Sequence, residues 1–138
     1  MNQNLIFWPV LAQIILTLVL YWLLAVRKSK VVRSGNFNRQ AAALDNKAWP
    51  IEVVKVSNNI DNQFESPILF YILCIVLYGI NGTNTVTVTL AWIFFLSRCV
   101  HAYVHVNSNY VPARFRAFLV SIAMLLFMVI SVAWQLAF

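Results

Sequence analysis

The feature that most constrains this chain is the uncharged apolar run "LIFWPVLAQIILTLVLYWLLAV" at residues 5–26. A helix of roughly 20 mostly apolar residues is long enough to cross a bilayer. Three more stretches of suitable length follow at residues 50–80, 85–106 and 115–138. Backbone polar groups in lipid must be satisfied within their own segment, so each stretch is expected to be a helix. The predicted fold class is all-α, an integral membrane four-helix bundle.

Composition supports the same interpretation. Apolar residues make up 62% of the 138-residue chain and charged residues only 10%, whereas charged residues make up about 25% of a typical soluble domain. The four spans leave little chain for anything else, so we expect a single membrane domain over residues 1–138. The net charge of +6 is expected to set topology and to meet anionic membrane lipid. No nucleic-acid-binding motif accompanies it, so no nucleic-acid partner is expected.

The connection after the first span, residues 27–50, is polar and basic and is expected to be a loop. The segment "RQAAAL" within it allows a short helix. Pro50 suits the first turn of the second span, with Asp45 or Asn46 just upstream as candidate caps.

The second span begins with polar residues and becomes apolar only at residues 67–80. Pro67 lies inside it and predicts a kink, because proline lacks a backbone N–H and clashes with the preceding turn. "NGTN" at residues 81–84 predicts a tight turn. The alternating "TVTVT" that follows is expected to be helical, because an isolated strand cannot span a bilayer.

Lysine and arginine counts predict the orientation of the bundle. Seven of the ten fall within residues 27–55, and Arg98, Arg114 and Arg116 lie at or near the connection between the third and fourth spans. The positive-inside rule then places both basic connections in the cytoplasm and both termini on the non-cytoplasmic side. No cleavable signal is evident, so we expect a multi-pass protein of a bacterial inner membrane, with the endoplasmic reticulum as the alternative.

Two spans carry stripes of polar residues at helical spacing. The stripes are Asn58, Asn62 and Glu65 on the second span, and Arg98, His101 and His105 on the third. Polar and charged groups inside membrane segments are costly and usually face a bundle interior or a cavity. Both stripes lie toward the expected cytoplasmic ends of their helices, so they can face each other.

Two interpretations of the stripes are open. Glu65 and Arg98 could form an ion pair between helices, with Asn62 and His101 as hydrogen-bonding groups that hold the helices together. Alternatively, the stripes could line a cationic pocket, open to the cytoplasm, for a small anionic ligand. A metal site is not expected, because no clear third ligand accompanies His101 and His105.

The order of three short motifs adds a resemblance. "NQFESP" on the second span, "RCVHAYVH" on the third and "PAR" at the start of the fourth resemble the MAPEG family, the membrane-associated proteins of eicosanoid and glutathione metabolism. The resemblance covers most of residues 55–120, and the topology of the rest is compatible with it. It implies a homotrimer of four-helix bundles that binds glutathione between neighbouring subunits, near the cytoplasmic face.

The resemblance also implies site residues. Those matching glutathione-binding positions are Asn62, Glu65, Arg98, His101, His105 and, at the end of the first helix, Arg27. Arg114 matches the arginine that contacts the glutathione sulfur in catalytic members. A guanidinium beside a thiol favours the thiolate, which is the nucleophile.

The chain departs from the catalytic members at four positions. Asn58 and Asp61 stand where arginines are common, and His105 and Phe118 stand where tyrosines are expected. The resemblance implies a glutathione-dependent transferase or peroxidase that acts on lipophilic electrophiles. The alternative is a non-catalytic relative that binds lipid or a partner protein. A small four-helix transporter is a third hypothesis, which the absence of a carboxylate from the first span disfavours.

Overall fold

Four helical spans in the structure are long and apolar enough to cross a membrane, as the apolar runs predict. The structure is a computed structural model that describes every residue from 1 to 138 and contains helices but no strands. The long helices are α1 (Phe7–Ser34), α3 (Ile51–Gln63), α4 (Ser66–Gly79), α5 (Thr85–Val106) and α6 (Val111–Ala137). Short elements are η1 (Gln3–Ile6), α2 (Arg39–Leu44) and η2 (Asn46–Ala48).

Helix α1 is longer than its apolar run. The prediction that the helix ends near residue 26 and gives way to a loop is wrong, because α1 continues to Ser34. Lysine and arginine have high helix propensity, so the basic residues after 26 extend the helix instead of ending it. Helix α1 stops where Gly35 takes a left-handed conformation with φ 69° and donates its N–H to the carbonyl of Val31.

The rest of the basic connection is also partly helical. Helix α2 forms at "RQAAAL", where a short helix was expected. Neither expected residue caps α3, since Asp45 accepts from the backbone N–H of Lys47 in η2 and Asn46 donates to Ser57. Pro50 itself occupies the N-cap position of α3, which has no side-chain cap.

The second span is two helices. Helix α3 ends at Gln63 and α4 begins at Ser66, so the kink expected at Pro67 is a break at residues 64–65, just upstream of it. Pro67 cannot donate to the carbonyl four residues earlier, and it is tolerated in the first turn of the new helix. Glu65 lies in the break, with φ −99° and ψ −105°.

The last two helices form a hairpin. Helix α5 has the predicted bounds and starts with a capping box, in which Asn84 and Thr87 satisfy each other's backbone N–H. Helix α6 begins at Val111, earlier than the predicted residue 115. Pro112 lies in its first turn, where proline is favoured.

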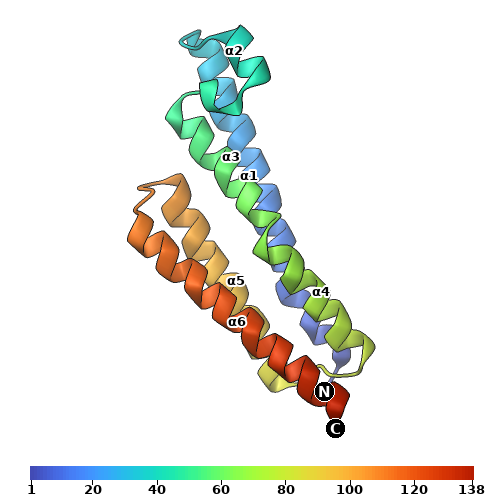
Figure 1. Cartoon of the computed structure of the whole chain (residues 1–138). Helices are drawn as coiled ribbons and strands as arrows, with labels where there is room; N and C mark the ends of the chain where they lie inside the picture. The colour runs from blue at the N-terminus through green and yellow to red at the C-terminus, as the bar shows by residue number, and fades with distance from the viewer.

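Figure 1 shows both termini at one end of the molecule and α2 at the other. Helix α1 runs beside α3 and α4, and α5 runs beside α6 (Figure 1). The N-terminus is tied to the turn before α5, because the side chain of Gln3 donates to the carbonyl of Thr83 and accepts from its N–H. The basic connections therefore lie at the opposite end from the termini, as the topology prediction requires.

The interior consists of two apolar clusters separated by polar residues. The first is Ile6, Phe70, Cys74, Leu77, Ala91, Phe94, Leu125, Met128 and Val132. The second is Leu20, Val56, Ile60, Ala102 and Val106. Between them along α1, α3 and α5 lie the buried polar side chains of Gln13, Gln63 and Arg98. These polar residues are where the bundle departs from a uniformly apolar core.

Candidate functional site

The break between α3 and α4 exposes backbone carbonyls that a continuous helix would have satisfied. The last four carbonyls of any helix lack an intrahelical partner. Here Nη2 of Arg98 on α5 donates to the carbonyl of Asn62 at 3.0 Å. Arg98 is only 1% exposed and Asn62 is half-buried, so the donor of this bond is shielded from water. The arginine of the third span therefore caps the helix that carries the first polar stripe.

A cleft opens beside this break. It has a volume of about 270 Å³ and lies among the break, α5 and α6. Its lining residues are Asn62, Glu65, His101, Val111, Arg114, Phe115 and Phe118. Four of the seven predicted site residues thus meet at one cleft, and they supply an amide, a carboxylate, an imidazole and a guanidinium.

The two histidines take opposite hydrogen-bonding roles. Nδ1 of His101 lies 3.1 Å from the carbonyl oxygen of Arg114, which can only accept, so Nδ1 carries the proton. The other ring nitrogen of His101, Nε2, is buried and has no partner. The side-chain amide of Asn62 donates to Nδ1 of His105 at 3.4 Å, so that nitrogen is the acceptor. His101 therefore joins α5 to α6, and His105 joins α5 to α3.

The charged groups of the cleft are not paired with each other. Arg114 donates through Nη1 to the side-chain oxygen of Asn109 at 2.6 Å. Glu65 is exposed and forms no ion pair. The hypothesis of a Glu65–Arg98 ion pair is therefore wrong, because the Arg98 guanidinium donates to the backbone carbonyl of Asn62 instead. A free carboxylate and a guanidinium on one cleft can bind complementary charges of a ligand.

The two stripes meet within one chain. The prediction that the two stripes can face each other is confirmed within a single subunit. Both the Arg98–Asn62 and the Asn62–His105 bonds join residues of the same chain. Asn58, at the start of the first stripe, is exposed and does not line the cleft.

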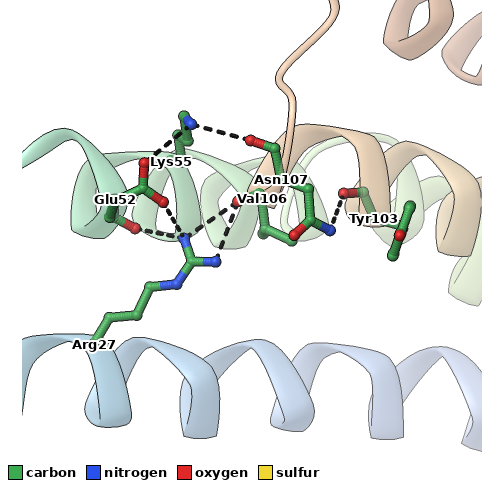
Figure 2. Close-up of polar contacts among 6 residues, drawn as sticks. All are labelled: Arg27, Glu52, Lys55, Tyr103, Val106 and Asn107. Carbon is green, nitrogen blue, oxygen red and sulfur yellow. Dashed lines mark hydrogen bonds and ion pairs between the residues drawn. The ribbon is translucent and has the colours of Figure 1, made fainter.

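Arg27, the seventh predicted site residue, does not line the cleft. Its Nη1 and Nη2 both donate to the carbonyl of Val106 at 3.2 Å, and Nη1 also donates to the backbone carbonyl of Glu52 at 2.7 Å. Figure 2 shows these contacts with Lys55, which bridges Glu52 to the carbonyl of Asn107. Arg27 thus caps the carboxyl end of α5, and within one chain the structure does not bring it to the cleft.

A row of buried amides was not anticipated. Gln13 on α1 donates to Gln63 at 2.8 Å, Gln63 donates to Asn59 at 3.1 Å, and Asn59 donates to the carbonyl of Ala102 on α5 at 3.1 Å. All three side chains are at most 1% exposed. The spacing of Asn59 and Gln63 at i and i+4 is the sequence signal for this second polar face of α3.

Comparison with known proteins gives one match. The family model described as the MAPEG family matches residues 5–134, which is nearly the whole chain. No curated protein and no solved structure matches. The family match confirms the resemblance drawn from the three motifs.

Proposed function

The chain belongs to the MAPEG family, and we propose on that basis that it is a membrane-bound glutathione-dependent transferase or peroxidase acting on lipophilic electrophiles. The observation that carries the proposal is the cleft itself. It presents Asn62 and Glu65 from the helix break, His101 from α5 and Arg114 from α6. These side chains complement the groups of glutathione, which has an amino group, two carboxylates and a thiol.

Three of these side chains would contact glutathione directly. The unpaired Glu65 carboxylate binds the amino group of glutathione, and the Asn62 amide hydrogen-bonds the peptide. Arg114 lies by the thiol and stabilises the thiolate by its positive charge. The thiolate sulfur then attacks an electrophilic carbon and forms a carbon–sulfur bond, either as a leaving group departs with its electron pair or as a double bond is opened and protonated. With a hydroperoxide the sulfur attacks the terminal oxygen, the O–O bond breaks and the alcohol leaves, and a second glutathione converts the sulfenic acid to the disulfide and water. Arg98 and His105 support the site through Asn62, to which both are bonded.

The size of the cleft bears on the assembly. Small-molecule sites usually enclose about 300–1,000 Å³, and this cleft of about 270 Å³ is below that range. A tripeptide and a lipophilic co-substrate need more room. In the proposal a homotrimer supplies it, with a neighbouring subunit closing the cleft from its open side. The cleft faces the cytoplasmic side in the orientation that the basic residues predict.

One observation favours a non-catalytic, lipid- or partner-binding function instead. Phe118 lines the cleft where a hydrogen-bond donor would help to hold a thiolate. Phe115 and Val111 make the same wall apolar. The second candidate function is therefore binding of a lipid or a partner protein at this cleft without glutathione chemistry.

The test is ultraviolet difference absorbance of the glutathione thiolate on the detergent-purified protein. Wild type is compared with Arg114→Ala and with Arg116→Ala, which removes an exposed arginine outside the cleft. A thiolate signal lost in Arg114→Ala and kept in Arg116→Ala supports the enzyme. Glutathione binding without thiolate indicates a degenerate site, and no binding overturns the proposal in favour of the second candidate.

A further inference from the structure

A second hollow lies on the outer face of α1. It shares no lining residue with the cleft described above. It has a volume of about 330 Å³ and is formed by side chains of this helix alone. Its lining residues are Trp22, Ala25, Val26, Ser29, Lys30 and Arg33. We propose that it binds the headgroup of an anionic phospholipid, with Lys30 and Arg33 on the phosphate and the acyl chains along the apolar part of α1.

The order of these residues along the helix matches the layers of a bilayer. The apolar run ends at Val26, and at 1.5 Å per residue Ser29 and Lys30 lie roughly 5 and 6 Å beyond it. The headgroup layer of one leaflet is about 5–7 Å thick. Trp22 is 67% exposed just below this level, where interfacial tryptophans are enriched. Ser29 and Lys30 are therefore at phosphate depth. Arg33 lies roughly 10 Å beyond Val26, and because helical side chains tilt toward the helix N-terminus, its long side chain extends back toward the same level.

Charge complementarity identifies an anionic ligand. Helix α1 contains no acidic residue. Lys30 and Arg33 form no ion pair, and the nearby carboxylate of Glu52 is already shared by Arg27 and Lys55, at 3.4 and 3.2 Å. Two cations without counter-ions at the membrane surface attract anionic lipid, and each is expected to strengthen binding roughly fivefold. A zwitterionic headgroup carries no net charge, so the two cations attract it less strongly.

The basic connection leaves this face of α1 open. Lys28 lies over the ring of Trp49 at 4.7 Å, and Trp49 stacks on Phe37 at 4.9 Å. This stack holds the connection on the Lys28 face of the helix. Residues two apart on a helix point to different sides, so Lys30 lies away from the stack and remains available to lipid.

The experiment measures lipid preference directly. The purified protein is reconstituted with spin-labelled phosphatidylglycerol or phosphatidylcholine of identical acyl chains, and the motionally restricted fraction of each is compared. We expect a preference for phosphatidylglycerol that falls roughly 10- to 30-fold in Lys30→Gln/Arg33→Gln. The charge-retaining Lys30→Arg/Arg33→Lys should keep it, and high salt should weaken it.

The matched control is Arg39→Gln/Lys47→Gln, which removes the same charge from exposed positions outside the hollow. An equal loss in this control would show that overall charge, not this hollow, selects the lipid, and would overturn the proposal. A wild-type protein with no preference for phosphatidylglycerol over phosphatidylcholine would also overturn it. Displacement of the lipid by inorganic phosphate, beyond the effect of sodium chloride at equal ionic strength, would overturn the assignment to a lipid. None of these lipid measurements depends on whether the protein binds glutathione.

Discussion

The guanidinium of Arg98 on α5 is bonded to the backbone carbonyl of Asn62 on α3, and it makes no ion pair with Glu65. The carbonyl is free because the helix breaks two residues later. One buried side chain thereby fixes the end of α3, the position of Asn62 and the start of the break that carries Glu65.

Replacing Arg98 with leucine should therefore destabilise the bundle. It leaves the half-buried carbonyl of Asn62 without a partner, which costs about 1–3 kcal/mol of the free energy of unfolding. Arg98→Lys keeps a charged N–H donor, so it should lose less of the free energy of unfolding. Thermal unfolding in detergent followed by circular dichroism measures both. An unchanged melting temperature for Arg98→Leu would contradict the capping role.

Arg27→Ala should lower stability more than it changes ligand binding. The substitution removes the bonds to the carbonyl of Val106 and the contact with Glu52, a loss of about 1–3 kcal/mol. Within one chain Arg27 does not line the cleft, so glutathione affinity should change less than in Arg114→Ala. Calorimetric titration with glutathione beside thermal unfolding separates the two effects. A large loss of affinity at unchanged stability would instead support direct binding by Arg27.

Gln13 and Gln63 should be energetically coupled. In a double-mutant cycle with Gln13→Leu and Gln63→Leu, we expect a coupling of about 0.6 kcal/mol and at most about 1.7 kcal/mol, as for other hydrogen bonds inside membrane proteins. The double variant should be more stable than the sum of the single losses predicts, because it leaves no broken pair between α1 and α3. If the losses in the free energy of unfolding of the two single variants are strictly additive, the hydrogen bond between Gln13 and Gln63 contributes nothing to stability.

Phe118→Tyr should strengthen thiolate formation in the proposed glutathione site. The ring lines the cleft 6.4 Å from that of His101, centroid to centroid. A hydroxyl there can hydrogen-bond the thiolate, and a bond to a charged group contributes about 1.5–3 kcal/mol, so the ratio of thiolate to thiol should rise at least about tenfold. The thiolate absorbance measures it. Phe127→Tyr, on an exposed position of α6 outside the cleft, is the control and should have no effect.

Much of the site could be predicted from spacing. The i, i+4 and i+7 positions of Asn58, Asn62 and Glu65 and the i, i+3 and i+7 positions of Arg98, His101 and His105 place them on two helix faces, and Asn62, Glu65 and His101 do meet at one cleft. Arg114, which the family resemblance and not the spacing singled out, lines the same cleft. Spacing could not predict the bonds that each side chain makes. An arginine can donate to a carboxylate or to a free carbonyl, and only the position of the helix break decides which is nearer. For the same reason Arg27 could be matched to a family position without revealing that it caps α5.

The sequence by itself determined the four spans, the kink in the second and the gathering of basic residues at one end. These properties follow from local hydropathy, proline chemistry and charge. The tertiary structure decided that Gln13 of α1 bonds to Gln63 of α3, that Arg27 and Arg98 each cap a helix other than their own, and that the cleft forms within one chain. These depend on the rotation and depth of each helix against its neighbours, and packing over the whole bundle sets both.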